Sequence, residues 1–152
     1  MNLTKVLAWN ALIYIFLHIL IDFTYTWIVF GDGAIENERK FRIRHEYFHH
    51  TLIENYQGLA TWGKERHMIC TDALGLKSKC TAREPTSNKF DFAFIGDSFT
   101  EGVGMAYEDT FVGMFASEFP NLSVANLGVS SYSPTIYLKK VEWLLQRGVV
   151  FE

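Results

Sequence analysis

The stretch "FDFAFIGDSFTEG", Phe90–Gly102, places a run of apolar residues directly before a glycine, an acid and a hydroxyl. The run Phe90–Ile95 has the length and composition of a short buried strand. Gly96 allows the chain to bend sharply after it, and the next main-chain N–H groups then point toward the region beside the Ser98 hydroxyl, as an oxyanion hole requires. Ser98 is therefore a candidate nucleophile. The alternative is that Asp97 and Ser98 only cap a helix.

The residues after this stretch alternate between strand and helix patterns. The predicted elements are a strand at 90–95, a helix at 109–119, a strand at 122–128, a helix from 133 to 148 and a strand that starts at 149. Parallel neighbours need crossover helices, so this order predicts an α/β fold with a flavodoxin-like, three-layer parallel sheet, incomplete in this sequence. Ligands of such sheets collect at the carboxyl ends of the strands, where Ser98 is expected.

The composition of the chain is that of a folded domain without a basic surface field. The 152 residues are 49% hydrophobic and 16% aromatic, and the formal net charge is -3. This length is typical of about one domain. Because nucleic-acid binding depends on clustered positive charge, the composition argues against a nucleic-acid partner.

The amino-terminal segment has the pattern of a membrane anchor. Residues 6–30 contain no Lys, Arg, Pro or Gly, and a helix of this length can cross a bilayer. A cleaved signal peptide is the alternative, but the apolar run is longer than the usual h-region. We therefore expect a membrane anchor at 1–30, an extracytoplasmic extension at 31–88 and a catalytic part at 89–152. An extracytoplasmic domain after the anchor requires the amino terminus to lie in the cytoplasm. More Lys and Arg residues follow the apolar run than precede it, and by the positive-inside rule this charge pattern opposes that orientation.

Two cysteines, Cys70 and Cys80, enclose a short loop. They form a disulfide if the domain lies in an oxidising compartment, and remain free thiols in a reducing cytosol. Neither lies in a C-x-x-C motif, so a metal knuckle or a redox motif is not expected.

The segment "HEYFH", His45–His49, matches the H-E-x-x-H pattern of zinc proteases. That chemistry requires a helix, whereas apolar and charged residues alternate from Phe41 onward, which predicts an extended strand. In one strand His45 and His49 would lie about 13 Å apart, too far for a shared metal. We expect no metal and no cofactor, and a structural role or a contact at the rim of the active site for the pair His49 and His50.

Glycine-based motifs give no other function. The spacing of Gly96, Gly102 and Gly104 fits neither a P-loop nor a dinucleotide fingerprint. The lipase elbow G-x-S-x-G fails because Thr100 occupies the second glycine position.

Two segments resemble a known hydrolase family. "FIGDSFTEGVG", Phe94–Gly104, resembles the first block of the SGNH (GDSL-like) hydrolases, and "VANLGVSSYSP", Val124–Pro134, is similar to the second block. The stretch "CTDALGLKSK" is similar to the membrane-anchored bacterial branch of this superfamily. The resemblance implies a serine ester hydrolase in which Ser98 attacks the ester carbonyl and the amides of Ser98 and Gly128 bind the oxyanion. Gly96 and Asp97 would shape the turn.

The sequence also departs from the family. The third block supplies an Asn to the oxyanion hole, and the last block supplies the Asp and His that activate the serine. Neither block occurs in these 152 residues. We therefore expect the N-terminal portion of a longer enzyme. An esterase assay on these residues alone should give no rate above the Ser98→Ala control, because a serine without a base is a poor nucleophile.

Two other functions remain open. The same scaffold is similar to O-acyltransferases of envelope polysaccharides, in which a sugar hydroxyl replaces water as the acyl acceptor. A non-catalytic, membrane-anchored binding module is the second alternative. In either case we expect an acylated glycan, lipid or small-molecule partner and a periplasmic location, on the basis of the resemblance alone.

Overall fold

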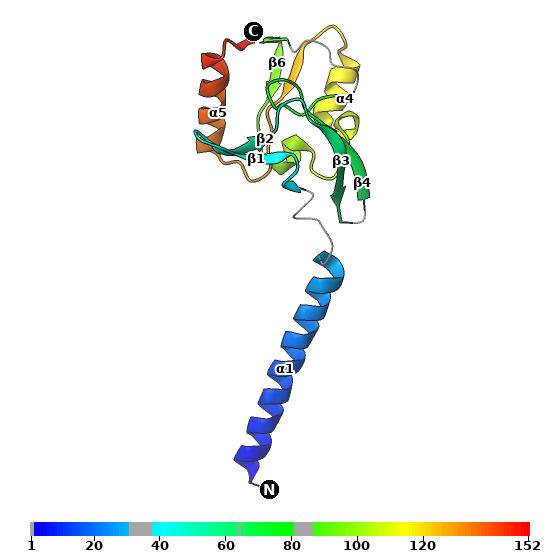
Figure 1. Ribbon diagram of the computed structural model, residues 1–152, viewed down its shortest axis with the longest axis vertical. Helices are drawn as coiled ribbons and strands as arrows, with labels where there is room; N and C mark the ends of the chain where they lie inside the picture. The colour runs from blue at the N-terminus through cyan, green and yellow to red at the C-terminus, as the bar shows by residue number, and fades with distance from the viewer. Residues whose placement is uncertain (1, 31–37, 64, 81–86) are drawn as a thin grey trace. The chain divides into compact units, whose positions relative to one another are not determined.

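The computed structural model describes residues 2–30, 38–63, 65–80 and 87–152 (Figure 1). The chain forms two compact units, residues 1–34 and 35–152. The first unit contains helix α1, Leu3–Phe30, which lies within the predicted anchor 1–30 and begins three residues before the apolar run 6–30. Its segment Leu3–Ile28 is long and apolar enough to span a membrane, a property that signal sequences share. The first residues of the predicted extension, 31–37, lie outside the described residues.

The second unit begins with two antiparallel hairpins. Strands β1, Arg42–His45, and β2, His49–Leu52, form the first hairpin, in which His45 is opposite His49. Strands β3, Gln57–Trp62, and β4, Glu65–Cys70, form the second. The alternation that begins at Phe41 therefore predicted extended structure, but the turn between β1 and β2 was not predicted.

Parallel pairs follow, with helices between their strands. Strand β5, Lys89–Phe90, pairs with β8, Val150–Phe151, and β6, Phe92–Phe94, pairs with β7, Val124–Asn126. The helical elements are α3, Ser98–Glu101, the 3-10 helix η1, Tyr107–Asp109, α4, Phe111–Glu118, and α5, Pro134–Gln146. Within this unit, α4 and α5 lie on opposite sides of the parallel strands (Figure 1).

The expected three-layer parallel sheet is not formed as one sheet. In the described part of the chain the strands make four two-stranded sheets, two antiparallel and two parallel. The predicted strand 90–95 is interrupted at Asp91, whose carboxylate accepts a hydrogen bond from Ser123 N (2.6 Å). A side chain thus takes the place of a main-chain acceptor, and the flanking strands β5 and β6 are only two and three residues long. The fold is mixed helix and sheet.

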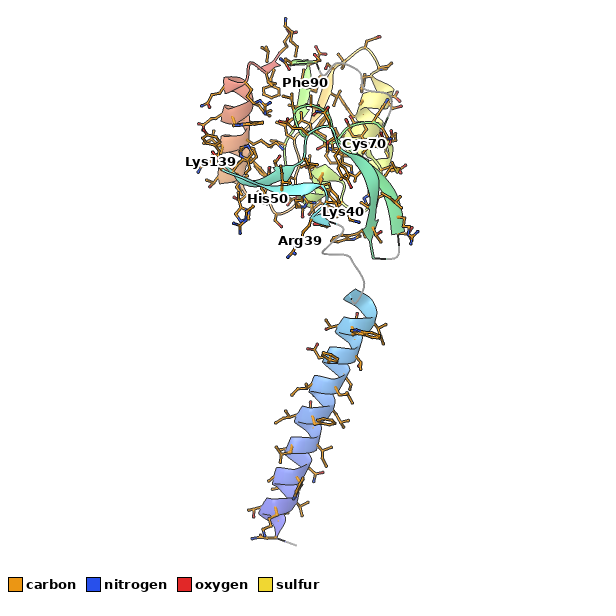
Figure 2. All side chains as sticks on the ribbon, viewed as in Figure 1. Arg39, Lys40, His50, Cys70, Phe90 and Lys139 are labelled. Atoms are coloured by element: carbon orange, nitrogen blue, oxygen red, sulfur yellow. A yellow bond between two sulfur atoms is a disulfide. The ribbon has the colours of Figure 1, made fainter. Side chains whose placement is uncertain are left out.

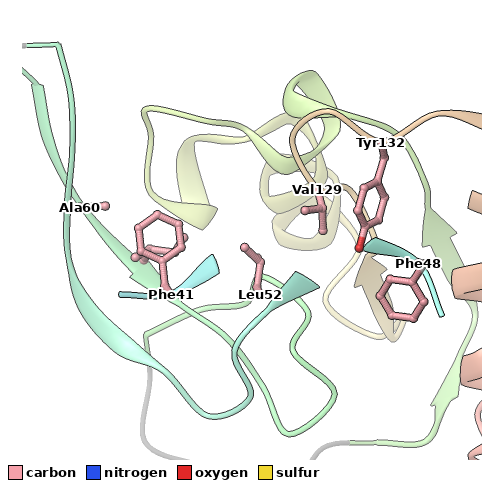
Figure 3. Packing of buried hydrophobic residues seen from close by; sticks show 7 residues of the cluster. Phe41, Phe48, Leu52, Ala60, Val129 and Tyr132 are labelled. Atoms are coloured by element: carbon pink, nitrogen blue, oxygen red, sulfur yellow. The ribbon is translucent and has the colours of Figure 1, made fainter. Parts of the chain in front are cut away.

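Two clusters of buried apolar side chains form the core of the second unit. One combines hairpin residues with the loop after β7, and Figure 3 labels these members of it: Phe41, Phe48, Leu52, Ala60, Val129 and Tyr132. The other lies around the parallel strands and α5, with Leu76, Phe90, Leu127 and Leu144 among its members. Because the first cluster joins residues 41–69 to residues 129–132, the described parts of the predicted extension and of the predicted catalytic part share one core.

Helix α5 corresponds to the helix predicted from 133 to 148. Ser133 is at its N-cap position without a side-chain capping hydrogen bond, Pro134 begins it, and Gly148 follows its end with φ +80°. Leu144 is buried and Ile136 and Val141 pack against the core clusters, whereas Leu145 is 51% exposed and Lys140 is buried. A lysine therefore occupies a core position of this helix.

Candidate functional site

Ser98 is the first residue of α3, directly after the turn that follows β6. Asp97 is the N-cap, and its Oδ1 accepts a hydrogen bond from Phe99 N (3.0 Å). Ser98 itself is half-buried, and its hydroxyl makes no hydrogen bond with the residues that the structure describes. The turn thus leaves the serine oxygen free while the neighbouring carboxylate is occupied with capping.

Gly96 and Gly128 are both sites of close packing against α3. A Cβ on Gly96 would collide with Thr100 Oγ1, and a Cβ on Gly128 would collide with Glu101 N and lie 2.7 Å from Thr100 C. Both positions therefore exclude side chains, because the space that a Cβ needs is already filled. Leu127 N donates to Phe94 O (2.8 Å), so the loop after β7 runs directly beside the turn that carries Ser98.

The Gly128 amide already has an acceptor. Gly128 N donates to Asn126 Oδ1 (3.0 Å), and Asn126 Nδ2 donates to Thr100 O (2.8 Å). Asn126 is 1% exposed and joins the loop after β7 to α3. For Gly128 to serve as an oxyanion donor, as the family resemblance implies, its N–H must be shared with Asn126 or released from it.

An ion pair between the half-buried Arg42 and the buried Glu101 holds the last residue of α3. Glu101 is 2% exposed, and its two carboxylate oxygens accept from Arg42 Nη1 (3.0 Å) and Nη2 (2.9 Å). Ser130 N donates to the same carboxylate. Burial lowers the pKa of Arg42, but the hydrogen bonds and the charge of Glu101 outweigh that effect, and the net shift of the pKa is upward. Arg42 therefore stays charged.

A second buried cation holds the residues after α3. Lys77 Nζ donates to Gly102 O (2.8 Å) and Met105 O (2.7 Å), and the residue is 2% exposed. Burial lowers its pKa to about 8, although the charge of Glu101 opposes the shift. Lys77 lies in the loop that the Cys70–Cys80 disulfide closes. The structure thus contains the disulfide that the cysteine spacing left open, and Figure 2 marks Cys70 at the end of β4.

The histidine pair lies beside the loop after β7. His50 Nε2 is 2.7 Å from Ser130 O, so this nitrogen donates, and His50 Nδ1 is 2.7 Å from His49 Nδ1. Burial lowers the pKa of His50, even though its bond to the Ser130 carbonyl raises it. The pair is therefore attached to the loop that carries Gly128. His50 is marked in Figure 2.

His45 does not converge with His49 on a metal site. Its ring stacks on Phe48 with the ring centres 3.6 Å apart, and the two histidines belong to opposite strands of a hairpin rather than to one extended strand. Within the described ranges, no group of three or more His, Cys, Asp and Glu side chains could hold a metal ion.

A narrow cavity of about 10 Å³ adjoins this network, lined in part by Arg42, His67, Lys77 and Glu101. It has room for about one water molecule. His67 Nδ1 is buried and has no hydrogen-bond partner among the described residues, and burial lowers the pKa of this histidine. The cavity is too small to hold a substrate.

The sequence indicated the serine turn but missed the residues that hold it. Ser98, Gly96 and Asp97 follow from a local pattern. The side chains of Arg42 and Glu101 meet across 59 positions of sequence, and no local signal marks such a pair. No family model and no curated protein sequence matches the chain.

Proposed function

We propose that the chain carries the nucleophile of an SGNH-type serine ester hydrolase that acts on an acyl ester. The ester would belong to a cell-surface glycan or lipid. The observation that carries this proposal is the Ser98 hydroxyl, which has no hydrogen-bond partner in the described part of the chain and lies in the turn between a parallel strand and a short helix. The loop after the neighbouring parallel strand lies beside this turn. This is the edge of an α/β sheet at which ligands are expected.

The reaction has two steps. In the first step Ser98 Oγ attacks the ester carbonyl carbon, its proton passes to a base, and the alcohol leaves with a proton. In the second step water attacks the acyl-serine and releases the carboxylic acid and the free serine. The Ser98 amide is the first candidate donor to the oxyanion and the Gly128 amide is the second, and each such donor is worth about 3 kcal/mol in the transition state.

The parallel strands, helix α1 and the disulfide support the fold and the location that we propose for this hydrolase. The two parallel pairs, β5 with β8 and β6 with β7, support an incomplete, flavodoxin-like sheet. Helix α1 supports an uncleaved membrane anchor, and the Cys70–Cys80 disulfide supports an oxidising, periplasmic location for the second unit. The base and acid of the reaction would be the Asp and His of the last family block.

Ester hydrolysis by the full product of the gene, purified in detergent, tests the proposal. We expect hydrolysis of a small aryl acetate, and a loss of at least about 10³-fold in kcat for Ser98→Ala. Ser117→Ala, an exposed serine on α4, is the matched control and should hydrolyse at the parent rate. Retention of the parent rate by Ser98→Ala would refute the proposal.

The same preparation separates the alternatives. If addition of an acceptor sugar moves the acyl group to the sugar at the expense of free acid, the protein is an O-acyltransferase. If the parent protein shows no turnover with esters or acceptors, the non-catalytic binding module is favoured.

A further inference from the structure

The described residues 38–63 and 65–80 reach α3 and the residues after it through two cations, the half-buried Arg42 and the buried Lys77. Arg42 of β1 makes two hydrogen bonds to Glu101, and Lys77 of the disulfide loop donates to the carbonyls of Gly102 and Met105. Charged side chains are almost never buried without a partner, so each of these contacts is needed for the burial of both groups. The positive charges converge on the carboxyl-terminal end of the helix, where they also favour its dipole.

Helix α3 cannot hold this position by itself. It contains four residues, and isolated helices of that length are unstable in water because nucleation is unfavourable. The carbonyl of Thr100 in α3 accepts a hydrogen bond from the Asn126 side chain. The carbonyls of Gly102 and Met105, which follow the helix, accept from Lys77. The location of Ser98 therefore depends on tertiary contacts.

Hydrogen bonds to Glu101 and to His50 also hold the loop after β7. Ser130 N donates to Glu101, Ser130 O accepts from His50, and the Tyr132 hydroxyl donates to His50 O (2.7 Å). Between them, Ser131 adopts φ +65°, a conformation that non-glycine residues rarely keep unless their surroundings hold them. Glu101 is thus the group through which Arg42 reaches both α3 and this loop.

We infer that Arg42 is a positioning residue that, through Glu101, fixes α3 and the loop 128–132 relative to each other, so that Ser98 becomes reactive only when Arg42 is folded against them. Lys77 holds the residues that follow α3. This inference rests on the proposed function for its catalytic part. Its structural part, the coupling of Arg42 to the Ser130 amide, stands independently of any activity.

The test compares variants of the full gene product in detergent micelles. Arg42→Ala removes the bidentate partner of Glu101, and Arg42→Lys keeps the charge but cannot form the two parallel bonds. Arg147→Ala is the matched control, because Arg147 forms an exposed ion pair with Glu54 (2.9 Å) that does not touch α3. Hydrogen exchange of single amides is measured by NMR, and the kinetics of ester hydrolysis are measured in parallel.

For Arg42→Ala we expect exchange of the Ser130 amide to speed up at least about tenfold, while Leu127, bonded to Phe94, keeps its rate. We also expect kcat to fall about 100-fold with little change in KM, because a small misplacement of the nucleophile affects the reaction more than binding. Arg42→Lys should recover part of both losses, and Arg147→Ala should resemble the parent.

An unchanged Ser130 amide in Arg42→Ala, or a Leu127 amide that speeds up by the same factor in both Arg42 variants, would overturn the inference. If Arg42→Ala does not fold, Glu101→Gln gives the same comparison, because a neutral amide oxygen is a weaker acceptor for Ser130 N. If the parent shows no Ser98-dependent turnover, the proposed function fails, and the Ser130 amide alone still decides the positioning role.

Discussion

Lys140 is a cation in the core of the second unit, and it lacks a hydrogen-bond partner among the described residues. It is 1% exposed, and its ammonium lies 5.2 Å from the centre of the Tyr132 ring. Burial lowers its pKa from 10.5 to about 7, although the charges of Glu101 and Asp72 oppose the shift. The interior therefore holds a lysine whose charged form is unfavourable.

This burial predicts that stability rises with pH. Because the unfolded chain binds the lysine proton more tightly, the folded state gains stability as pH rises from about 7 to 10.5, and the full cost applies below about 7. We expect Lys140→Met to raise the free energy of unfolding by about 1–4 kcal/mol at pH 6, and the gain to shrink toward pH 10.5. Urea unfolding at several pH values measures it.

The adjacent residue provides the control for this prediction. Lys139 is exposed on α5 and is marked in Figure 2, so Lys139→Met should change stability by less than about 0.5 kcal/mol at any pH. A Lys140→Met variant that is less stable than the parent at pH 6 would show that the buried ammonium has a favourable partner.

Residue-level features were predictable where they depend on neighbours in sequence. The helix cap at Asp97, which the sequence offered as the alternative to a catalytic role, follows from the local pattern. Gly96 was expected to permit a sharp bend, and its close packing against Thr100 was not predicted. The burial of Lys140 was not predicted either, since charged residues are usually exposed and its environment is supplied by distant segments.

At the scale of elements, the disulfide loop 70–80 is the connection between the hairpins and α3. It contains a turn in which Asp72 Oδ1 accepts from Leu74 N (2.8 Å) and Leu76 N (2.9 Å), and it delivers Lys77 to the core. A disulfide stabilises mainly by restricting the unfolded chain.

We expect the double substitution Cys70→Ser and Cys80→Ser to lower the free energy of unfolding by about 2–3 kcal/mol, as a loop of this length implies. Denaturant unfolding of the parent and the double variant, both in detergent, measures the difference. Equal midpoints for the two proteins would mean that the disulfide adds nothing to the hydrogen bonds already present in the loop.

Element order was predicted better than sheet pairing. The alternation of apolar runs and helical spacing predicted strands β6, β7 and β8, helices α4 and α5, and the parallel direction of the strand pairs. It did not predict the short helices α3 and η1. The interruption at Asp91 and the β1–β2 turn were missed, because both depend on single hydrogen bonds and turns that hydrophobic periodicity does not report.

At the scale of the whole molecule, one of the positive charges that follow α1 forms ion pairs in the folded second unit. The sequence places Arg39, Lys40, Arg42 and Arg44 after the apolar segment. Arg42 is committed to Glu101 and Glu38 in the folded unit, so fewer of these cations are free than the sequence suggests.

An uncleaved anchor predicts how the protein behaves in cells. The full product should remain in the membrane fraction after an alkaline carbonate wash, whereas a variant that lacks residues 1–34 should be released, because α1 supplies the apolar span. Mass spectrometry of the purified protein gives its amino terminus. A mature chain that begins near residue 34 would show instead that α1 is a cleaved signal sequence.

The central claim is that Ser98 is a nucleophile held by its surroundings in a reactive position. Labelling of the full gene product with a fluorophosphonate, followed by peptide mapping with mass spectrometry, tests it most directly. We expect one covalent adduct, on Ser98, which is absent from Ser98→Ala and strongly reduced in Arg42→Ala. An adduct on a different residue, or no adduct on a protein shown to be folded, would contradict the claim.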